Sequence, residues 1–173
     1  LRSYVAVRGG VDVDRVLGSC STDRLSGLGP PALAAGDALG VGTHREPLPV
    51  ADLVVGASPP TLDEDVHLPI LLGPRDDWFA VEAHRLLTQA RFEVTPDSDR
   101  VGVRLAGPVL PRRIERELTS EGVVEGSLQA PPGGRLTIFG PGHPVSGGYP
   151  VIGVVRARAL PLVAQLRPGQ GVR

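Results

Sequence analysis

The sequence predicts a mainly β fold in which many short strands form a closed or semi-closed barrel, with one main helix and a short helix near the C-terminus. Short runs rich in Val, Leu and Ile alternate with clusters of glycine and proline. Such clusters are typical of turns, because glycine accepts positive φ and proline fixes φ. One segment shows a sustained helical period. A barrel suits so many short strands, since it hides their unpaired edges.

The first 65 residues predict short elements followed by a linker. We expect a strand at 3–8, a turn of helix at 12–17 and a surface loop at 18–29. Gly36 and Asp37 indicate a tight turn before a short strand that ends at Val41. Residues 42–65 contain four prolines and no sustained period, which predicts a linker.

The clearest helix is expected within residues 77–90. An apolar stripe with the spacing i, i+3, i+4 and i+7 runs along it, formed by Ala83, Leu86, Leu87 and Ala90. Asp77 is a suitable cap for its start. A strand is expected just before this helix, at 66–72, and its Pro69 favours an edge position because proline cannot donate a ladder hydrogen bond.

Further strands and a second helix complete the pattern. Strands at 92–95 and 101–105 flank a turn at 96–99. Three more strands are expected at 122–130, 135–139 and 149–156. A last short helix is expected at 160–166, because proline is tolerated in a first turn and an Arg-Pro-Gly sequence ends the segment.

Composition excludes several kinds of chemistry. All 18 basic residues are arginines, so there is no lysine for a Schiff base, a P-loop or the attachment of biotin. The net charge of −1 argues against a general attraction to nucleic acid. No apolar run approaches the length of a membrane span, and the single Cys20 fits a reducing cytoplasm. The four histidines are scattered, so we predict no metal site.

Two arginines, one just before and one within the expected strand at 101–105, form the first candidate constellation. Arg100 and Arg104 are four residues apart, and even spacing places them on one face of a strand. Together with Ser98 and Asp99 they are candidates for binding a carboxylate or phosphate. The alternative is a surface loop in which Asp99 pairs with Arg100.

A carboxylate and an amide form the second constellation. Glu121 precedes a glycine, and it can act as a general base if burial raises its pKa. The alternative is a solvated turn residue. Gln129 can hydrogen-bond an amide ligand or satisfy a backbone group at the end of the barrel.

The third constellation is a glycine turn with a tyrosine. The N–H groups of Gly147 and Gly148 can form an anion-binding nest, and Tyr149 can donate to an oxyanion or simply cap a strand. His143 lies just upstream, and a lone histidine often has a structural role. Because antiparallel neighbours bring alternate turns to one end of a barrel, we expect the three constellations to converge on one rim.

Several motifs in order resemble the family of the 5-oxoprolinase C subunit. They are YVAVRGGVDVDRVLGSCSTDRLSGLG at 4–29, GPRDDWF at 73–79, TPDSDRVGVRLAG at 95–107, LTSEGVVEGSLQAPPGG at 118–134 and SGGYPVIGVV at 146–155. This family is also called allophanate hydrolase subunit 2. It is similar to the carboxyltransferase domain of urea carboxylase and to a bacterial antagonist of a sensor-kinase inhibitor.

The resemblance implies a cyclophilin-like β-barrel fold in two halves. Residues 1–62 would be the remainder of the first half with a linker, and residues 63–173 would be a nearly whole second half. Family members are longer, and the sequence begins with Leu rather than Met. We therefore expect a fragment that lacks an N-terminal segment and is inactive by itself.

The resemblance also implies a function. The chain would be a carboxyltransferase-like subunit of a cytoplasmic, ATP-dependent 5-oxoprolinase, a hydrolase that cleaves a small anionic amide or lactam. ATP would act through partner subunits, including a second cyclophilin-like subunit, and biotin, if used, would be carried by another chain. The substrate stays open between 5-oxoproline, urea and allophanate. The alternatives are a regulatory protein that antagonises a sensor-kinase inhibitor and a biotin-dependent urea-type carboxyltransferase.

The expected site follows from these readings. Candidate catalytic residues are Glu121, Tyr149 and Arg104. Candidate substrate-binding residues are Ser98, Asp99, Arg100, Gln129, His143, Gly147 and Gly148. The chain departs from the family in one place: an aspartate commonly precedes the position of His143, and here that residue is Gly142.

Overall fold

The computed structural model describes residues 4–23, 26–44 and 60–173. The chain divides into two compact units, and the described residues of the first are 4–23 with 26–44, while those of the second are 60–173. The expected domain boundary after residue 62 stays a prediction. Most of the expected linker at 42–65 lies outside the described residues.

The N-terminal unit contains one small pair of strands. β1 (Val11–Asp12) pairs antiparallel with β2 (Gly40–Val41). The expected turn before β2 is confirmed, since the N–H of Asp37 donates to the carbonyl of Ala34 at 3.2 Å and Gly36 has a φ of 97°. None of the described residues of this unit is buried. The unit therefore has no apolar core among its described residues.

Two expectations in this unit are wrong. The described part of the expected strand at 3–8 has no regular structure, because no strand of the described residues pairs with it. The expected turn of helix at 12–17 is instead a tight loop in which Val16 and Ser19 exchange backbone hydrogen bonds at 3.0 Å. Leu17 and Gly18 form the tip of this loop with φ of 51° and 81°, which a helix excludes.

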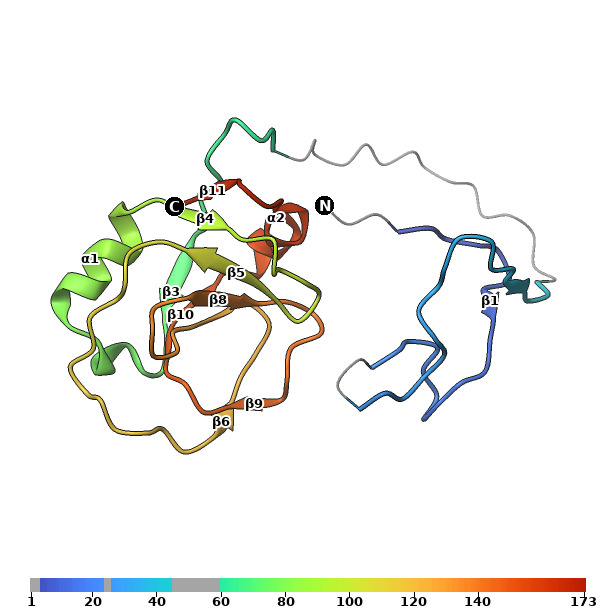
Figure 1. Ribbon diagram of the computed structural model, residues 1–173, viewed down its shortest axis with the longest axis horizontal. Helices are drawn as coiled ribbons and strands as arrows, with labels where there is room; N and C mark the ends of the chain where they lie inside the picture. Colours follow the sequence, from blue (N-terminus) through green and yellow to red (C-terminus); the bar gives the residue numbers. More distant parts are fainter. Residues whose placement is uncertain (1–3, 24–25, 45–59) are drawn as a thin grey trace. The chain divides into compact units, whose positions relative to one another are not determined.

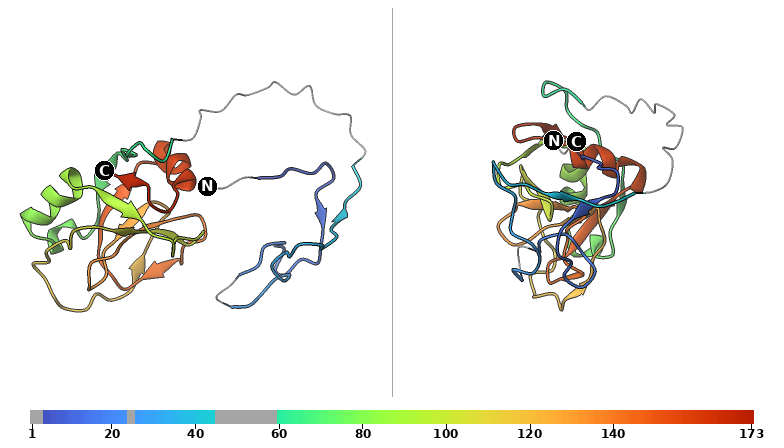
Figure 2. Two further views of the ribbon diagram at one scale, coloured as in Figure 1. Left: turned by 45° about the horizontal axis from the view of Figure 1, so that its top comes forward. Right: turned by 90° about the vertical axis from the view of Figure 1, so that its right-hand side faces the viewer.

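The C-terminal unit is built on an antiparallel sheet with the strand order β11-β4-β5-β8-β7-β10-β3 (Figure 1). Its strands are β3 (Ile70–Leu72), β4 (Phe92–Val94), β5 (Gly102–Ala106), β7 (Ser127–Gln129), β8 (Leu136–Phe139), β10 (Val151–Val155) and β11 (Gly171–Val172). The two views in Figure 2 show how strongly this sheet curls. The mainly β prediction is confirmed.

The two edges of the curled sheet meet. The segment just before β3 bonds to β11: the N–H groups of Val66 and Leu68 donate to the carbonyls of Gly171 and Arg173 at 2.8 and 2.9 Å. The N–H of Arg173 returns a bond of 3.0 Å to Val66. This pairing satisfies backbone groups that an open sheet would leave free. β3 itself is the last strand in the order, which confirms the edge position that Pro69 predicts.

Both helices lie where the sequence predicts them. η1 (Asp76–Trp78) leads into α1 (Val81–Gln89), and the stripe of α1 buries Ala83 and Leu87. The N-cap of α1 is Ala80 and has no side-chain hydrogen bond, so the expected cap at Asp77 is wrong, because Asp77 belongs to the 3₁₀ turn before the helix. η2 (Ala157–Ala159) precedes α2 (Leu160–Gln165), which has a proline in its first turn.

The expected strand at 122–130 is two strands. β6 (Glu121–Gly122) pairs with β9 (Ser146–Gly147) as a separate two-stranded ribbon, whereas β7 belongs to the large sheet. Gly126 separates them, with a φ of 84° that favours glycine. Its N–H donates to Phe139 and its carbonyl accepts from Val155, both at 2.8 Å. The turn therefore fits between two strands of the sheet.

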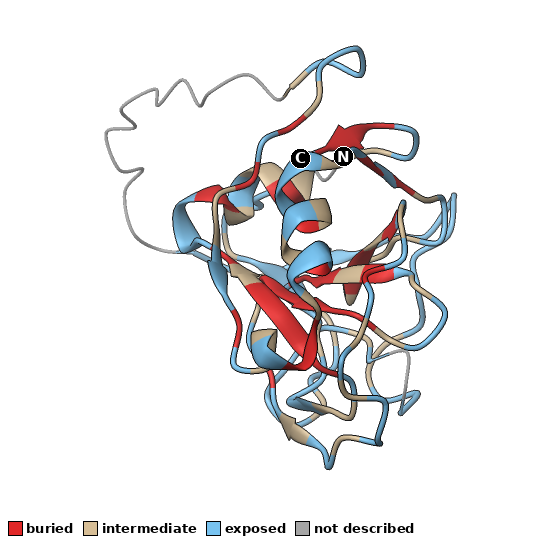
Figure 3. Ribbon diagram, turned by 90° about the vertical axis from the view of Figure 1, so that its left-hand side faces the viewer, coloured by how far each residue is buried: buried red, intermediate tan, exposed pale blue. Residues whose placement is uncertain are grey.

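The apolar core occupies both faces of this sheet. Buried side chains from the strands and both helices form the main cluster, and Figure 3 shows the buried segments along the strands. A second, smaller cluster consists of Val123, Phe139 and Val151. Val123 directly follows β6, so this cluster attaches the β6–β9 ribbon to the outer face of the sheet.

Candidate functional site

A row of polar side chains crosses three strands of the sheet. Arg104 of β5 pairs with Thr137 of β8, and Thr137 pairs with Gln129 of β7. Directly paired residues on neighbouring antiparallel strands point to the same face, so these three side chains share one face. The adjacent positions Val103, Ile138 and Leu128 are buried in the main core. The polar row therefore lies on the outer face, with Arg104 and Gln129 two strand spacings, roughly 10 Å, apart.

The β6–β9 ribbon lies against the Gln129 end of this row. Glu121 and Gly147 are register partners in the ribbon. A Cβ on Gly147 would lie 2.5 Å from Nε2 of Gln129, so only glycine fits this approach without a shift. Nε2 of Gln129 donates to the carbonyl of Tyr149 at 3.3 Å. The structure thus brings Glu121, Gln129, Gly147 and Tyr149 together from three segments of the chain.

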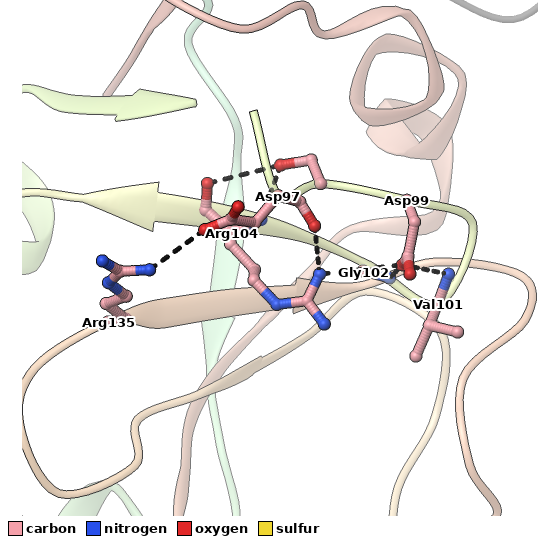
Figure 4. A network of polar contacts seen from close by, with 7 residues as sticks. Asp97, Asp99, Val101, Gly102, Arg104 and Arg135 are labelled. Atoms are coloured by element: carbon pink, nitrogen blue, oxygen red, sulfur yellow. Dashed lines mark hydrogen bonds and ion pairs between the residues drawn. The ribbon is translucent and has the colours of Figure 1, made fainter. Parts of the chain in front are cut away.

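The turn before β5 holds Arg104 in place (Figure 4). The Ser98 hydroxyl accepts from the N–H of Arg104 at 2.9 Å. Nη1 of Arg104 donates to the carbonyl of Asp97 and lies 3.8 Å from Oδ1 of Asp99. Oδ1 of Asp99 also accepts from the N–H groups of Val101 and Gly102, at 2.9 and 3.2 Å. These contacts fix the guanidinium while its side chain stays 36% exposed.

Arg100 lies in a different setting. It precedes β5, so the alternation of a strand does not place it on the face of Arg104. Arg100, Ser98 and Asp99 line a cavity of about 170 Å³ whose other wall contains Val163, Ala164, Leu166 and Pro168. The backbone carbonyl of Arg100 accepts a hydrogen bond from the N–H of Gly142 at 3.0 Å. Arg100 therefore lies outside the strand, and the expected strand position that would place it on the face of Arg104 is wrong.

Glu121 is held by an arginine that the sequence motifs did not single out. Nε of Arg75 donates to Oε2 of Glu121 at 2.9 Å, and Nη2 donates to Oε1. The hydrogen bond from Arg75 lowers the pKa of Glu121, and partial desolvation opposes this only in part. A general base near neutral pH needs a raised pKa. The local geometry thus favours the ionised form of the Glu121 carboxyl, held by Arg75.

The glycine turn does not form a nest. An anion-binding nest needs successive residues in right-handed and left-handed backbone conformations. Gly147 is a residue of β9, and neither Gly147 nor Gly148 has a positive φ. The side chain of Tyr149 is exposed. His143 lies on the loop after β8, with Nδ1 2.7 Å from the carbonyl of Pro144 and its ring centroid 6.1 Å from that of Phe139. Binding roles for these residues stay predictions.

The described residues hold neither a metal cluster nor a membrane-spanning helix. No group of three or more His, Cys, Asp or Glu side chains in residues 4–23, 26–44 and 60–173 is arranged to hold a metal ion. Within the same ranges, no helix combines the length and the apolar character that crossing a membrane requires.

Comparison with known proteins gives consistent matches along the chain. It is 31% identical over 175 residues to the C subunit of 5-oxoprolinase from Escherichia coli (strain K12), covering 99% of the chain. It is 28% identical to the C subunit of 5-oxoprolinase from Haemophilus influenzae, covering 98%. The chain spans about half the length of these curated relatives, 55% and 54%.

Solved structures agree with these matches. The crystal structure of TTHA0988 is 38% identical with a TM-score of 0.74, over 95% of this chain and 31% of that one. The crystal structure of the K. lactis urea amidolyase is 27% identical with a TM-score of 0.77, over 97% of this chain and 12% of that one. The family model for the carboxyltransferase domain, subdomains A and B, matches residues 1–173. The chain therefore belongs to the carboxyltransferase domain family.

Proposed function

We propose that this chain is the carboxyltransferase-like part of a 5-oxoprolinase C subunit, acting in an ATP-dependent complex that opens a small lactam. The observation that carries the proposal is the match of nearly the whole chain to two relatives of that name. Because the chain spans about half of each relative, the activity belongs to the complete protein.

The polar row suits such a substrate. 5-Oxoproline has one carboxylate and one lactam amide. Arg104 offers its guanidinium to the carboxylate, since the fork of arginine matches carboxylate geometry. The side-chain amide of Gln129 offers its carbonyl and the N–H that does not donate to Tyr149, which complement the N–H and C=O of a lactam. The two side chains lie two strand spacings apart, roughly 10 Å, on one face of the sheet with Thr137 between them, which is the scale of one small ligand.

Cofactors and partners are assigned to other chains. The chain contains no lysine, so biotin cannot be attached to it, and biotin chemistry would need a carrier elsewhere. In this proposal ATP acts with partner subunits, one of which is a second cyclophilin-like subunit. The residues of this chain bind and orient the amide.

A second candidate is a urea-type carboxyl transfer. The similarity to the K. lactis urea amidolyase favours it, because that match covers 97% of this chain. Urea itself is uncharged, so in this reaction Arg104 would meet a carboxylate only in the transferred carboxyl group and in the allophanate product. The two readings therefore differ in the dependence of substrate binding on that residue.

The test uses the full-length protein purified with its partner subunits. ATP hydrolysis is measured with 5-oxoproline, urea or allophanate, and in each case for wild type, Arg104→Gln and Arg135→Gln. Arg135 is the matched control, because it belongs to the same turn network and bonds the Asp97 carboxylate through an exposed pair at 3.1 Å. We expect ATP hydrolysis that depends on 5-oxoproline, is reduced by Arg104→Gln and is retained by Arg135→Gln. Stimulation by urea with added biotin carrier, or by none of the three compounds, would reject the proposal.

A further inference from the structure

One ion pair ties the ribbon beside Gln129 to the body of the sheet. The guanidinium of Arg75 and the carboxylate of Glu121 form two parallel hydrogen bonds, Nε to Oε2 at 2.9 Å and Nη2 to Oε1. The two residues are 46 positions apart in the sequence. Bidentate pairs of this kind fix both distance and orientation.

Backbone hydrogen bonds to β10 hold the segment that contains Arg75. The N–H of Arg75 donates to the carbonyl of Val151 at 3.2 Å, and the N–H of Gly73 donates to Ile152 at 2.8 Å. A Cβ on Gly73 would lie 2.4 Å from the oxygen of Val151, so the turn lies directly on β10. The next element, η1, buries Trp78 at 4% exposure. The position of the Arg75 backbone is therefore set by the sheet.

The ribbon is less firmly built. β6 and β9 contain two register pairs, and one more backbone bond joins Val123 to Val145 at 3.1 Å. So short a pair of strands is marginal without packing or side-chain ties. Glu121 is the register partner of Gly147, and Gly147 is the residue that lies on Gln129. A displacement of Glu121 therefore displaces the segment that covers Gln129.

We propose that Arg75 is a positioning residue of the candidate site, and that Glu121 is its anchor on the ribbon rather than a general base. The pair sets the distance of Gly147 and of the Tyr149 carbonyl from Gln129, and so fixes the orientation of the Gln129 amide. This inference rests on the proposed function for its effect on catalysis, but its structural part can be measured without any substrate.

The experiment compares single and reversed variants in the full-length protein with its partner subunits. The variants are Arg75→Gln, Arg75→Lys, Glu121→Gln and the double reversal Arg75→Glu with Glu121→Arg. The matched control is Arg85→Gln, because Arg85 forms the same two-bond pair with Glu82, at 3.0 and 2.5 Å, on the exposed face of α1. Hydrogen exchange of residues 146–149 reports the ribbon, and kcat and KM report the site.

We expect Arg75→Gln and Glu121→Gln each to speed exchange at 146–149 by about tenfold, since a lost charged hydrogen bond loosens the segment locally. Arg75→Lys should give a smaller effect, because it keeps the charge and loses the fork. The double reversal should restore protection and at least half of the lost kcat, and Arg85→Gln should change neither quantity.

The outcomes separate the possible roles. A reversal that restores protection without restoring kcat shows that the Glu121 carboxylate itself takes part in the chemistry, which overturns the proposal. Unchanged exchange in both single variants overturns it as well, as does a reversal that restores neither quantity. If the wild-type complex acts on none of the tested substrates, the proposed function fails, but the exchange data still decide whether the pair holds the ribbon.

Discussion

Adding one methyl group at Gly147 tests the contact on which the candidate site depends. In Gly147→Ala the new Cβ would lie 2.5 Å from Nε2 of Gln129, whereas ordinary contacts begin at 3.4 Å. The amide must retreat by about 0.9 Å, the difference between these two distances. Gln129 is 8% exposed, so it has little free space in which to move.

The cost can be worked from the contacts that break. Retreat of Gln129 removes its 3.3 Å hydrogen bond to the Tyr149 carbonyl, worth about 1 kcal/mol for a neutral pair. The new methyl group meets only the far end of a flexible side chain, so the lost hydrogen bond is most of the cost, and we expect a decrease of about 1–1.5 kcal/mol in the free energy of unfolding. Gly148→Ala is the matched control, because its nearest contact would be an ordinary 3.5 Å.

The assay is a double-mutant cycle with Gln129→Ala, read by denaturant unfolding. Gly147→Ala should be costly in the wild-type background and nearly neutral when Gln129 has been shortened, giving an interaction term of at least about 1 kcal/mol. Gly148→Ala should change stability by less than about 0.5 kcal/mol in both backgrounds. Equal effects of Gly147→Ala in the two backgrounds would refute the contact between Gly147 and Gln129.

Three further predictions follow from other parts of the chain. Hydrogen bonds from Arg173, and to a smaller extent from Arg91, lower the pKa of Asp65. This carboxyl therefore stabilises the fold fully above its ordinary pKa, and the stabilisation is lost as the pH falls through its pKa in the folded state. Asp65→Asn should remove this part of the acid sensitivity in unfolding curves measured between pH 7 and pH 2. Arg104→Ala should weaken substrate binding by about 1.5–3 kcal/mol, the scale of a charged hydrogen bond, and unchanged KM and kcat would contradict it. Because its described residues include none that is buried, the N-terminal unit should associate through exposed apolar groups; a monomer with cooperative unfolding in analytical ultracentrifugation and calorimetry would count against this.

Local signals predicted much of the fold. The stripe that includes Ala83 and Leu87 indicated α1, and Pro69 indicated an edge strand, because periodicity and proline act within a few residues. The break at Gly126 was missed, since Val123 and Val124 before it and Leu128 after it suggest one strand. The short strand β11 was missed because two residues carry too little pattern to be recognised.

The site was less predictable than the fold. Strand register places Arg104 and Gln129 in one row, and register depends on pairing that no single segment encodes. Arg75 was missed because its partner Glu121 is 46 residues away, and such a pair leaves no local period. The signal that could have indicated Arg75 is its position in the motif GPRDDWF at 73–79. The pKa of Glu121 could not be predicted for the same reason.

The meeting of the two sheet edges has a consequence for synthesis on the ribosome. Asp65, beside the first partner segment, and Arg173, beside the last strand, are 108 residues apart. At typical elongation rates the ribosome needs roughly 5–20 s to make that length of chain. During this interval the segment around Val66 and Leu68 has no β11 to receive it, and an unpaired edge can recruit other chains. The nascent chain is therefore exposed to misassembly at this edge until β11 has been made.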